Sequence, residues 1–148
     1  MMKKISRLSF FVIFLMMFCS LKDLYAQEPW TEKQLMQPAD LANLINSSSS
    51  DKPIIFSIGV GAVIKGSIDI GPAREKANLE KFKKELSKLP LNSNIVIYCG
   101  CCPFIHCPNI RPAFQLLNEM KFTRHKLLNL AINIKTDWIS KGYPVQDY

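Results

Sequence analysis

The chain has 148 residues, enough for one globular domain, and its five cysteines are too few and too clustered for a fold stapled by disulfides. Its formal net charge is +7 at neutral pH, but the basic residues are scattered along the chain. This composition speaks against a nucleic-acid-binding protein and favours, at most, the attraction of small anions.

The first 26 residues have the layout of a secretory signal peptide. Basic residues at positions 3, 4 and 7 precede an apolar run over 8–18, and the segment ends in the small residue Ala26. This run is shorter than the roughly 20 residues that a transmembrane helix needs. We therefore expect cleavage after Ala26 and export to a bacterial periplasm, with no membrane attachment of the mature chain. Lipidation at Cys19 ranks second, because Phe18 is bulky where a small residue is required, and an uncleaved anchor ranks third.

Removal of this leader, whose net charge is +3, leaves residues 27–148 with a net charge of about +4. These 122 residues suit a single domain. Residues 34–36 are predicted as a short edge strand, and Pro38 opens a helix over 39–45. After a polar loop, residues 53–58 are apolar and rich in β-branched side chains, which predicts a buried strand.

Glycines interrupt the chain after this strand, and the alternation then continues. Residues 67–70 are predicted as a short strand, and residues 73–89 as a helix because their apolar side chains recur at helical spacing. The elements that follow are predicted as a strand over 94–98, a helix over 111–120, a strand over 125–130 and a helix over 134–141. Strands that alternate with helices predict an α/β fold with a mainly parallel central sheet flanked by helices.

The remaining cysteines, Cys99, Cys101, Cys102 and Cys107, all lie within nine residues. Clustering in one loop indicates chemistry there rather than disulfide staples between distant segments. Cys99 directly follows the strand over 94–98 and precedes a helix, whose N-terminus favours an anion and lowers the pKa of a nearby thiol. Export to an oxidising compartment favours disulfide formation in this loop unless a partner keeps it reduced.

The order of these motifs resembles the rhodanese (sulfurtransferase) domain. The resemblance rests on a strand, a cysteine loop and an arginine that opens a helix, followed by a strand, a tryptophan-bearing helix and a Gly-Tyr-Pro-Val tail. In this chain the corresponding segments read IVIYC, RPAFQLLNEMKF, KLLNL and DWISKGYPV. The earlier segment KGSIDI, residues 65–70, is similar to the family's PGAxNIP segment. The resemblance spans essentially all of residues 27–148.

The resemblance implies a rhodanese-like domain in which Cys99 becomes a persulfide and Arg111 binds a small anionic sulfur donor such as thiosulfate. A thiol acceptor or reductant would then remove the sulfur, and no cofactor is required. Backbone N–H groups of the loop and of the following helix would hold the persulfide charge. Cys102 is the competing candidate for the nucleophile.

The chain departs from the family pattern at three places. Eleven residues separate Cys99 from Arg111, whereas the family's loop is compact. Ser57-Ile58-Gly59 stands where the family has Asp-Val-Arg, and residues 62–65 lack the family's usual histidine. Because of these departures, the family's fold carries over to this chain better than the family's activity.

The extra cysteines leave three roles open. One is a resolving thiol that attacks a persulfide or sulfenate on its neighbour. Another is a disulfide such as Cys102–Cys107. The third is a soft metal such as copper, held by Cys101, Cys102 and Cys107 with His106, because Cu(I) prefers thiolates and the spacing fits no standard zinc pattern.

The sequence therefore predicts a leading function and one alternative. The first is an exported sulfurtransferase or persulfide carrier of the thiosulfate sulfurtransferase type. The alternative is a catalytically divergent rhodanese fold whose cysteine loop binds a soft metal or cycles between dithiol and disulfide. A purely structural interpretation has the loop locked by two disulfides as an interaction surface.

Overall fold

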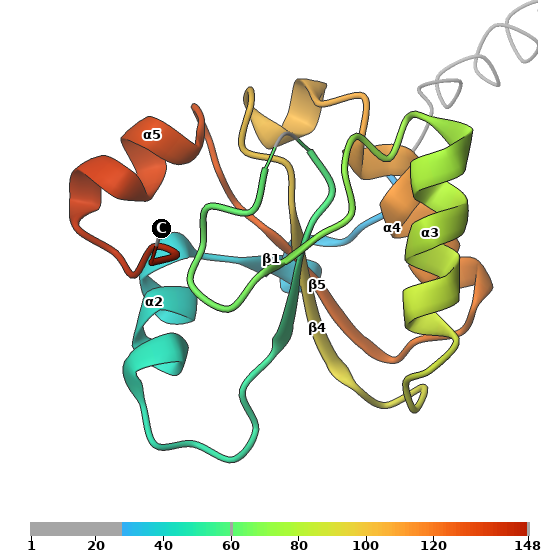
Figure 1. The fold of residues 1–148 in the computed structure, drawn as a ribbon, viewed down its shortest axis with the longest axis horizontal. Helices are drawn as coiled ribbons and strands as arrows, with labels where there is room; N and C mark the ends of the chain where they lie inside the picture. The colour runs from blue at the N-terminus through green and yellow to red at the C-terminus, as the bar shows by residue number, and fades with distance from the viewer. Residues whose placement is uncertain (1–27, 60, 148) are drawn as a thin grey trace, which may run out of the picture.

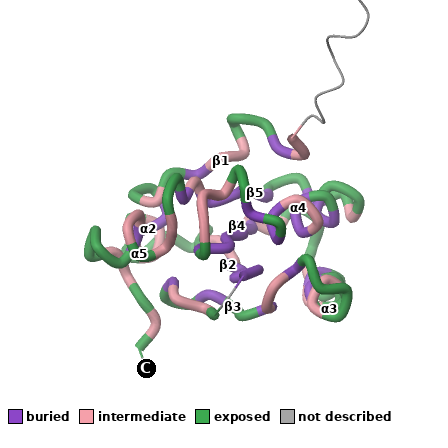
Figure 2. Tube along the Cα trace, turned by 90° about the horizontal axis from the view of Figure 1, so that it is seen from above, coloured by how far each residue is buried: buried purple, intermediate pink, exposed green. Residues whose placement is uncertain are grey.

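A five-stranded sheet in the order β1-β5-β4-β2-β3 runs through the computed structural model of the chain (Figures 1 and 2). The structure describes residues 28–59 and 61–147, so the predicted leader lies outside the described residues. Within those ranges, no helix has the length and apolar character needed to cross a membrane.

The strands are β1 (Leu35–Met36), β2 (Ile54–Ser57), β3 (Ile68–Asp69), β4 (Asn94–Tyr98) and β5 (Arg124–Leu128). The α-helices are α2 (Pro38–Asn46), α3 (Lys76–Leu86), α4 (Ile110–Glu119) and α5 (Ile134–Asp137), and the 3-10 turns are η1 (Glu32–Gln34), η2 (Phe104–His106) and η3 (Ile139–Lys141). Every pairing between these strands is parallel. The predicted α/β architecture with a parallel, helix-flanked sheet is thereby confirmed.

Helices cover both faces of the sheet (Figure 1). α3 and α4 pack on one face with alternate residues of β2, β4 and β5, including Phe56, Ile95 and Leu127. α2 and the C-terminal segment around Trp138 pack on the other face with the intervening residues, such as Val96. The central strands are buried accordingly (Figure 2), which explains why their sequences are continuous apolar runs.

Two predicted helices are shorter than their apolar patterns suggest. The helix predicted over 73–89 begins only at Lys76, because the Ala73 N–H donates to the Ile58 carbonyl at 3.1 Å and this bond holds the preceding turn against β2. The helix predicted over 134–141 breaks at Trp138, whose backbone leaves the helical region (φ −128°, ψ −65°). There the indole Nε1 donates to the Pro144 carbonyl at 2.9 Å, so the fully buried ring ties the chain end to the domain.

The end of β4 is held by the hydroxyl of Tyr98. This buried oxygen accepts from the backbone N–H groups of Val63 at 2.9 Å and Ile64 at 3.2 Å, and it shares a hydrogen bond with Ser67 Oγ at 3.0 Å. One side chain thus supplies the partners that the buried loop between β2 and β3 needs. It also holds β4 one residue before Cys99.

Replacement of Tyr98 by Phe is expected to lower the free energy of unfolding by about 2–4 kcal/mol, because it leaves buried polar groups without partners. Tyr143→Phe is the matched control, since Tyr143 packs its ring on Trp138 at 5.2 Å between centroids and its hydroxyl has no hydrogen bond among the described residues. Urea unfolding of the two variants measures the difference. Equal stabilities would contradict the role given to the Tyr98 hydroxyl.

Candidate functional site

Cys99 lies at the carboxyl edge of the sheet, directly after β4, with 3% of its surface exposed. The end of β2 approaches it closely: a Cβ on Gly59 would come within 2.4 Å of the Cys99 carbonyl oxygen and 2.7 Å of its sulfur. Only glycine fits such an approach. Cys99 therefore fills the space that a side chain at Gly59 would need.

The loop after Cys99 is attached to the C-terminal part of the domain. The Gly100 carbonyl accepts from the Ile134 N–H at 2.9 Å, and the Phe104 N–H donates to the Leu130 carbonyl at 3.0 Å. Gly100 has φ +86°, and a Cβ there would lie 3.0 Å from Ile134 Cβ, so glycine is required for both conformation and space. These bonds give the long loop a defined position although eleven residues separate Cys99 from Arg111.

The loop gathers three of the four cysteines. The sulfur atoms of Cys99, Cys101 and Cys107 all lie within 4.8 Å of one another, and we call these residues the sulfur cluster. Cys99 and Cys101 are 3.2 Å apart, and Cys102 lies 3.3 Å from Cys101. All four are free thiols; Cys99 and Cys107 are buried, whereas Cys101 is exposed. The sulfur atoms therefore form a continuous path from the interior to the surface.

Negative charge in the sulfur cluster concentrates on Cys99. The Cys107 thiol, the Asn109 amide and the backbone and thiol of Cys101 donate to its sulfur and lower the pKa of Cys99 to about 5, although burial alone would raise it. Burial and the neighbouring Cys99 and Cys102 raise the pKa of Cys101 to about 12. Its hydrogen bond with Cys99, together with burial, raises the pKa of Cys107. At neutral pH this arrangement favours one thiolate supported by protonated neighbours.

Asn109 was missed by the sequence analysis. It is 5% exposed, its Oδ1 accepts from the Arg74 N–H at 3.1 Å, and its Nδ2 donates to the Cys99 sulfur at 3.3 Å. The bond to Arg74 fixes which end of the amide faces the thiol. An asparagine just before a helix is usually taken for a helix cap, but this one makes no side-chain cap bond to α4.

Arg111, the predicted anion binder, lies in the first turn of α4. Its guanidinium donates to Glu28 Oε1 at 2.5 Å and to the Ile105 carbonyl at 3.1 Å, and it lies 5.6 Å from the centroid of the Trp30 ring. Among the described residues, none of its hydrogen bonds or ion pairs reaches a cysteine sulfur. Its binding of a donor anion stays a prediction.

The proposed soft-metal ligands are only partly brought together. Of Cys101, Cys102, Cys107 and His106, the structure places Cys101 and Cys107 with Cys99 in the sulfur cluster. Cys102 lies outside this group of three sulfurs, and its own sulfur is 3.3 Å from that of Cys101. His106 is exposed at the end of η2 and does not belong to the cluster. The candidate ligand set of the described residues therefore consists of three thiols without an imidazole.

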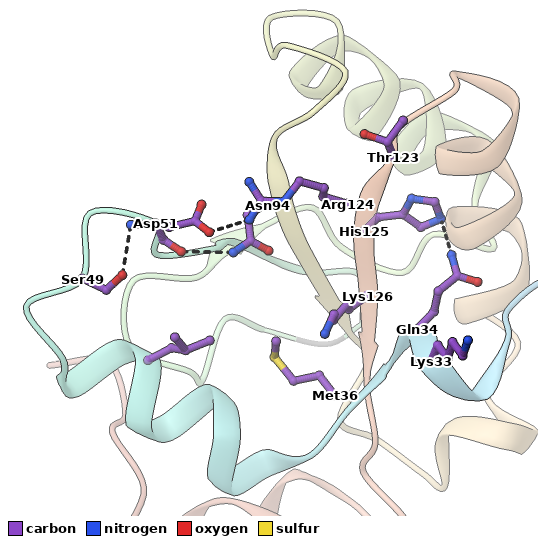
Figure 3. Close-up of a pocket in the computed structure, with 11 residues that line it drawn as sticks. Lys33, Gln34, Met36, Ser49, Asp51, Asn94, Thr123, Arg124, His125 and Lys126 are labelled. Atoms are coloured by element: carbon purple, nitrogen blue, oxygen red, sulfur yellow. Dashed lines mark hydrogen bonds and ion pairs between the residues drawn. The ribbon is translucent and has the colours of Figure 1, made fainter.

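A separate cavity of about 470 Å³ lies at the opposite edge of the sheet, where β4 and β5 begin (Figure 3). Arg124 on its wall forms an ion pair with Asp51, and His125 Nε2 lies 3.2 Å from Gln34 Nε2 and 2.9 Å from Asn118 Oδ1. Burial lowers the pKa of His125, as expected for a histidine packed in the core. Parallel sheets carry their ligand sites at the carboxyl ends of the strands, which is where the sulfur cluster lies.

No family model, curated protein or solved structure matches the chain. The resemblance to rhodanese therefore stays a prediction from the order of the motifs.

Proposed function

We propose that the protein is an exported, rhodanese-like sulfur carrier that takes a sulfur atom from a small anionic donor such as thiosulfate onto Cys99. The observation that carries this proposal is the convergence of hydrogen-bond donors on the Cys99 sulfur, led by Cys107 and Asn109. The same donors suit a persulfide, whose charge also needs stabilisation in a buried position. The leader over residues 1–26 supports export, with the periplasm as the compartment.

The chemistry needs one nucleophile and no cofactor. The Cys99 thiolate attacks the outer sulfur of thiosulfate, a new S–S bond forms, and the original S–S bond breaks. The electron pair of the broken bond leaves with sulfite, and the negative charge passes to the outer sulfur of the Cys99 persulfide. A thiol acceptor or reductant then removes that sulfur.

Arg111 is the candidate for binding the sulfonate end of the donor, since a guanidinium binds oxyanions through parallel N–H groups. Its pairing with Glu28 makes that carboxylate an internal competitor. Glu28 belongs to the segment at the start of the predicted mature chain, and its second carboxylate oxygen is buried without a partner. The sulfur donor therefore has to displace the Glu28 carboxylate, one of whose oxygens lacks a hydrogen-bond partner within the described residues.

The reduced protein is expected to release sulfite from thiosulfate, and Cys99→Ser is expected to abolish this release. Asn109→Asp should slow it at least tenfold, about 1.4 kcal/mol in the barrier. The carboxylate keeps an acceptor for the Arg74 N–H but repels both the thiolate and the donor. Single-turnover sulfite assays measure the rates. Release that survives Cys99→Ser but not Cys102→Ser would move the nucleophile to Cys102.

The role of Arg111 is tested through its partner. Glu28→Gln removes the competing carboxylate and should lower the KM for thiosulfate by about threefold to tenfold, whereas Arg111→Ala should raise it by a similar factor. Arg124→Ala is the charge-matched control, because Arg124 pairs with Asp51 at the opposite edge of the sheet and should leave KM unchanged. An unchanged KM in both site variants would remove Arg111 from donor binding.

A second function is favoured by the geometry of the sulfur cluster: we propose that it can bind one Cu(I) ion. Three sulfurs at about 2.3 Å from a trigonal ion lie about 4 Å apart, and those of Cys99, Cys101 and Cys107 already lie within 4.8 Å of one another. Cu(I) prefers soft thiolates, whereas structural zinc takes four ligands. Two of the three cysteines are buried, which protects a bound ion from solvent.

Titration of the reduced protein with Cu(I) against a chromophoric Cu(I) chelator should show about one ion per chain, held by thiolates. Cys101→Ser and Cys107→Ser should each weaken binding at least 100-fold, more than the roughly 10–100-fold loss typical of an outer partner. His106→Ala should have no effect, because His106 lies outside the cluster. Binding that persists in Cys107→Ser, or that depends on His106, would contradict this site.

A further inference from the structure

We infer that Cys101 resolves the persulfide formed on Cys99, so that the protein releases the sulfur as hydrosulfide and is left with a Cys99–Cys101 disulfide. This inference rests on the proposed persulfide chemistry at Cys99 and adds the fate of the sulfur atom. Without an external reductant, each chain would reduce one molecule of the sulfur donor and then stop as the disulfide, rather than hold a stable persulfide.

The distance between the two sulfurs favours this reaction. Cys99 and Cys101 Sγ are 3.2 Å apart, and formation of a bond of about 2.05 Å needs an approach of little more than 1 Å. The intervening Gly100 makes this geometry possible, since its positive φ turns the chain so that the two thiols face each other.

Cys101 differs from the other candidate thiols in its exposure to solvent. Because only 3% of Cys99 is exposed, a bulky acceptor thiol is hindered from reaching the Cys99 sulfur. Cys101, in contrast, lies at the surface. Cys107 is buried and serves as a donor to Cys99, so a disulfide to it would be shielded from any reductant. Cys102 is next to Cys101 but does not belong to the sulfur cluster. Cys101 is therefore the thiol that reaches both the buried sulfur and an external reductant.

The reaction needs only the Cys99 persulfide and the Cys101 thiol as reactants. The Cys101 sulfur attacks the inner sulfur of the persulfide, which is Cys99 Sγ, and a bond forms between the two protein sulfurs. The bond between the inner and outer persulfide sulfurs breaks, and its electron pair leaves with the outer sulfur. That sulfur carries away the Cys101 proton as hydrosulfide. Two cysteine thiols are oxidised to a disulfide while the sulfane sulfur is reduced, and an external dithiol resets the protein at Cys101.

The test follows both products of one turnover. The full mature chain, reduced and desalted without oxygen, is mixed with thiosulfate, and sulfite, sulfide and intact mass are measured. We expect about one sulfide for each sulfite and a mass loss of about 2 Da, the two hydrogens of a new disulfide. Cys101→Ser also changes a hydrogen-bond partner of Cys99, so its sulfite release should be slower. In this variant we expect the sulfide released per sulfite to fall at least tenfold, and each chain that has released sulfite to gain about 32 Da, one retained sulfur atom.

The outcomes separate this inference from the proposal on which it rests. A wild-type protein that releases sulfite but keeps the extra sulfur would overturn the role of Cys101 and leave Cys99 as the nucleophile. Sulfide release that is lost in Cys102→Ser and retained in Cys101→Ser would identify Cys102 as the resolving thiol and overturn the role given to Cys101. Absence of sulfite in both wild type and Cys101→Ser would overturn the proposed function itself. Because Cys101 is exposed, its replacement by Ser should leave the melting temperature unchanged, and this is measured first.

Discussion

The charge on the Cys99 sulfur is the feature on which the candidate site depends. A buried anion is unfavourable unless donors surround it, and here the Cys107 thiol and the Asn109 amide lead the groups that offset burial. Segments that are distant in sequence hold the Asn109 amide and the loop that carries Cys107. The turn before α3 fixes the Asn109 amide through the Arg74 N–H, and the Ile134 N–H fixes the loop through Gly100. The thiolate is therefore a product of the whole domain and not of the loop alone.

The proposed persulfide chemistry, Cu(I) binding and disulfide formation would all use Cys99, a member of the sulfur cluster. A bound ion would remove the nucleophile, and a Cys99–Cys101 disulfide would remove both. In an oxidising compartment the state of the loop is then set by the reductant that reaches it. Cys101 is the exposed member of the sulfur cluster, so contact with such a reductant is expected there.

The length of the cysteine loop has a consequence for Arg111. This loop includes η2, and the Ile105 carbonyl at the centre of η2 accepts a hydrogen bond from the guanidinium. Glu28 and Trp30 complete the surroundings of this charge from the N-terminal side. The long loop and the segment around Glu28 thus hold the Arg111 guanidinium together.

The alternation of strands with helices predicted the parallel sheet. Apolar patterning predicted the central strands, because strands buried on both faces must be continuous apolar runs. It also placed Cys99 at the end of β4, since a strand end is a local feature. Local patterns failed where long-range bonds decide: at Ala73, held by Ile58, and at Trp138, whose ring is tied to Pro144. Only the tertiary structure selected Cys101 and Cys107 among the neighbouring thiols, brought Asn109 to the sulfur and paired Arg111 with Glu28. Those contacts join residues by distance and direction in space, which the order of residues along a loop does not specify.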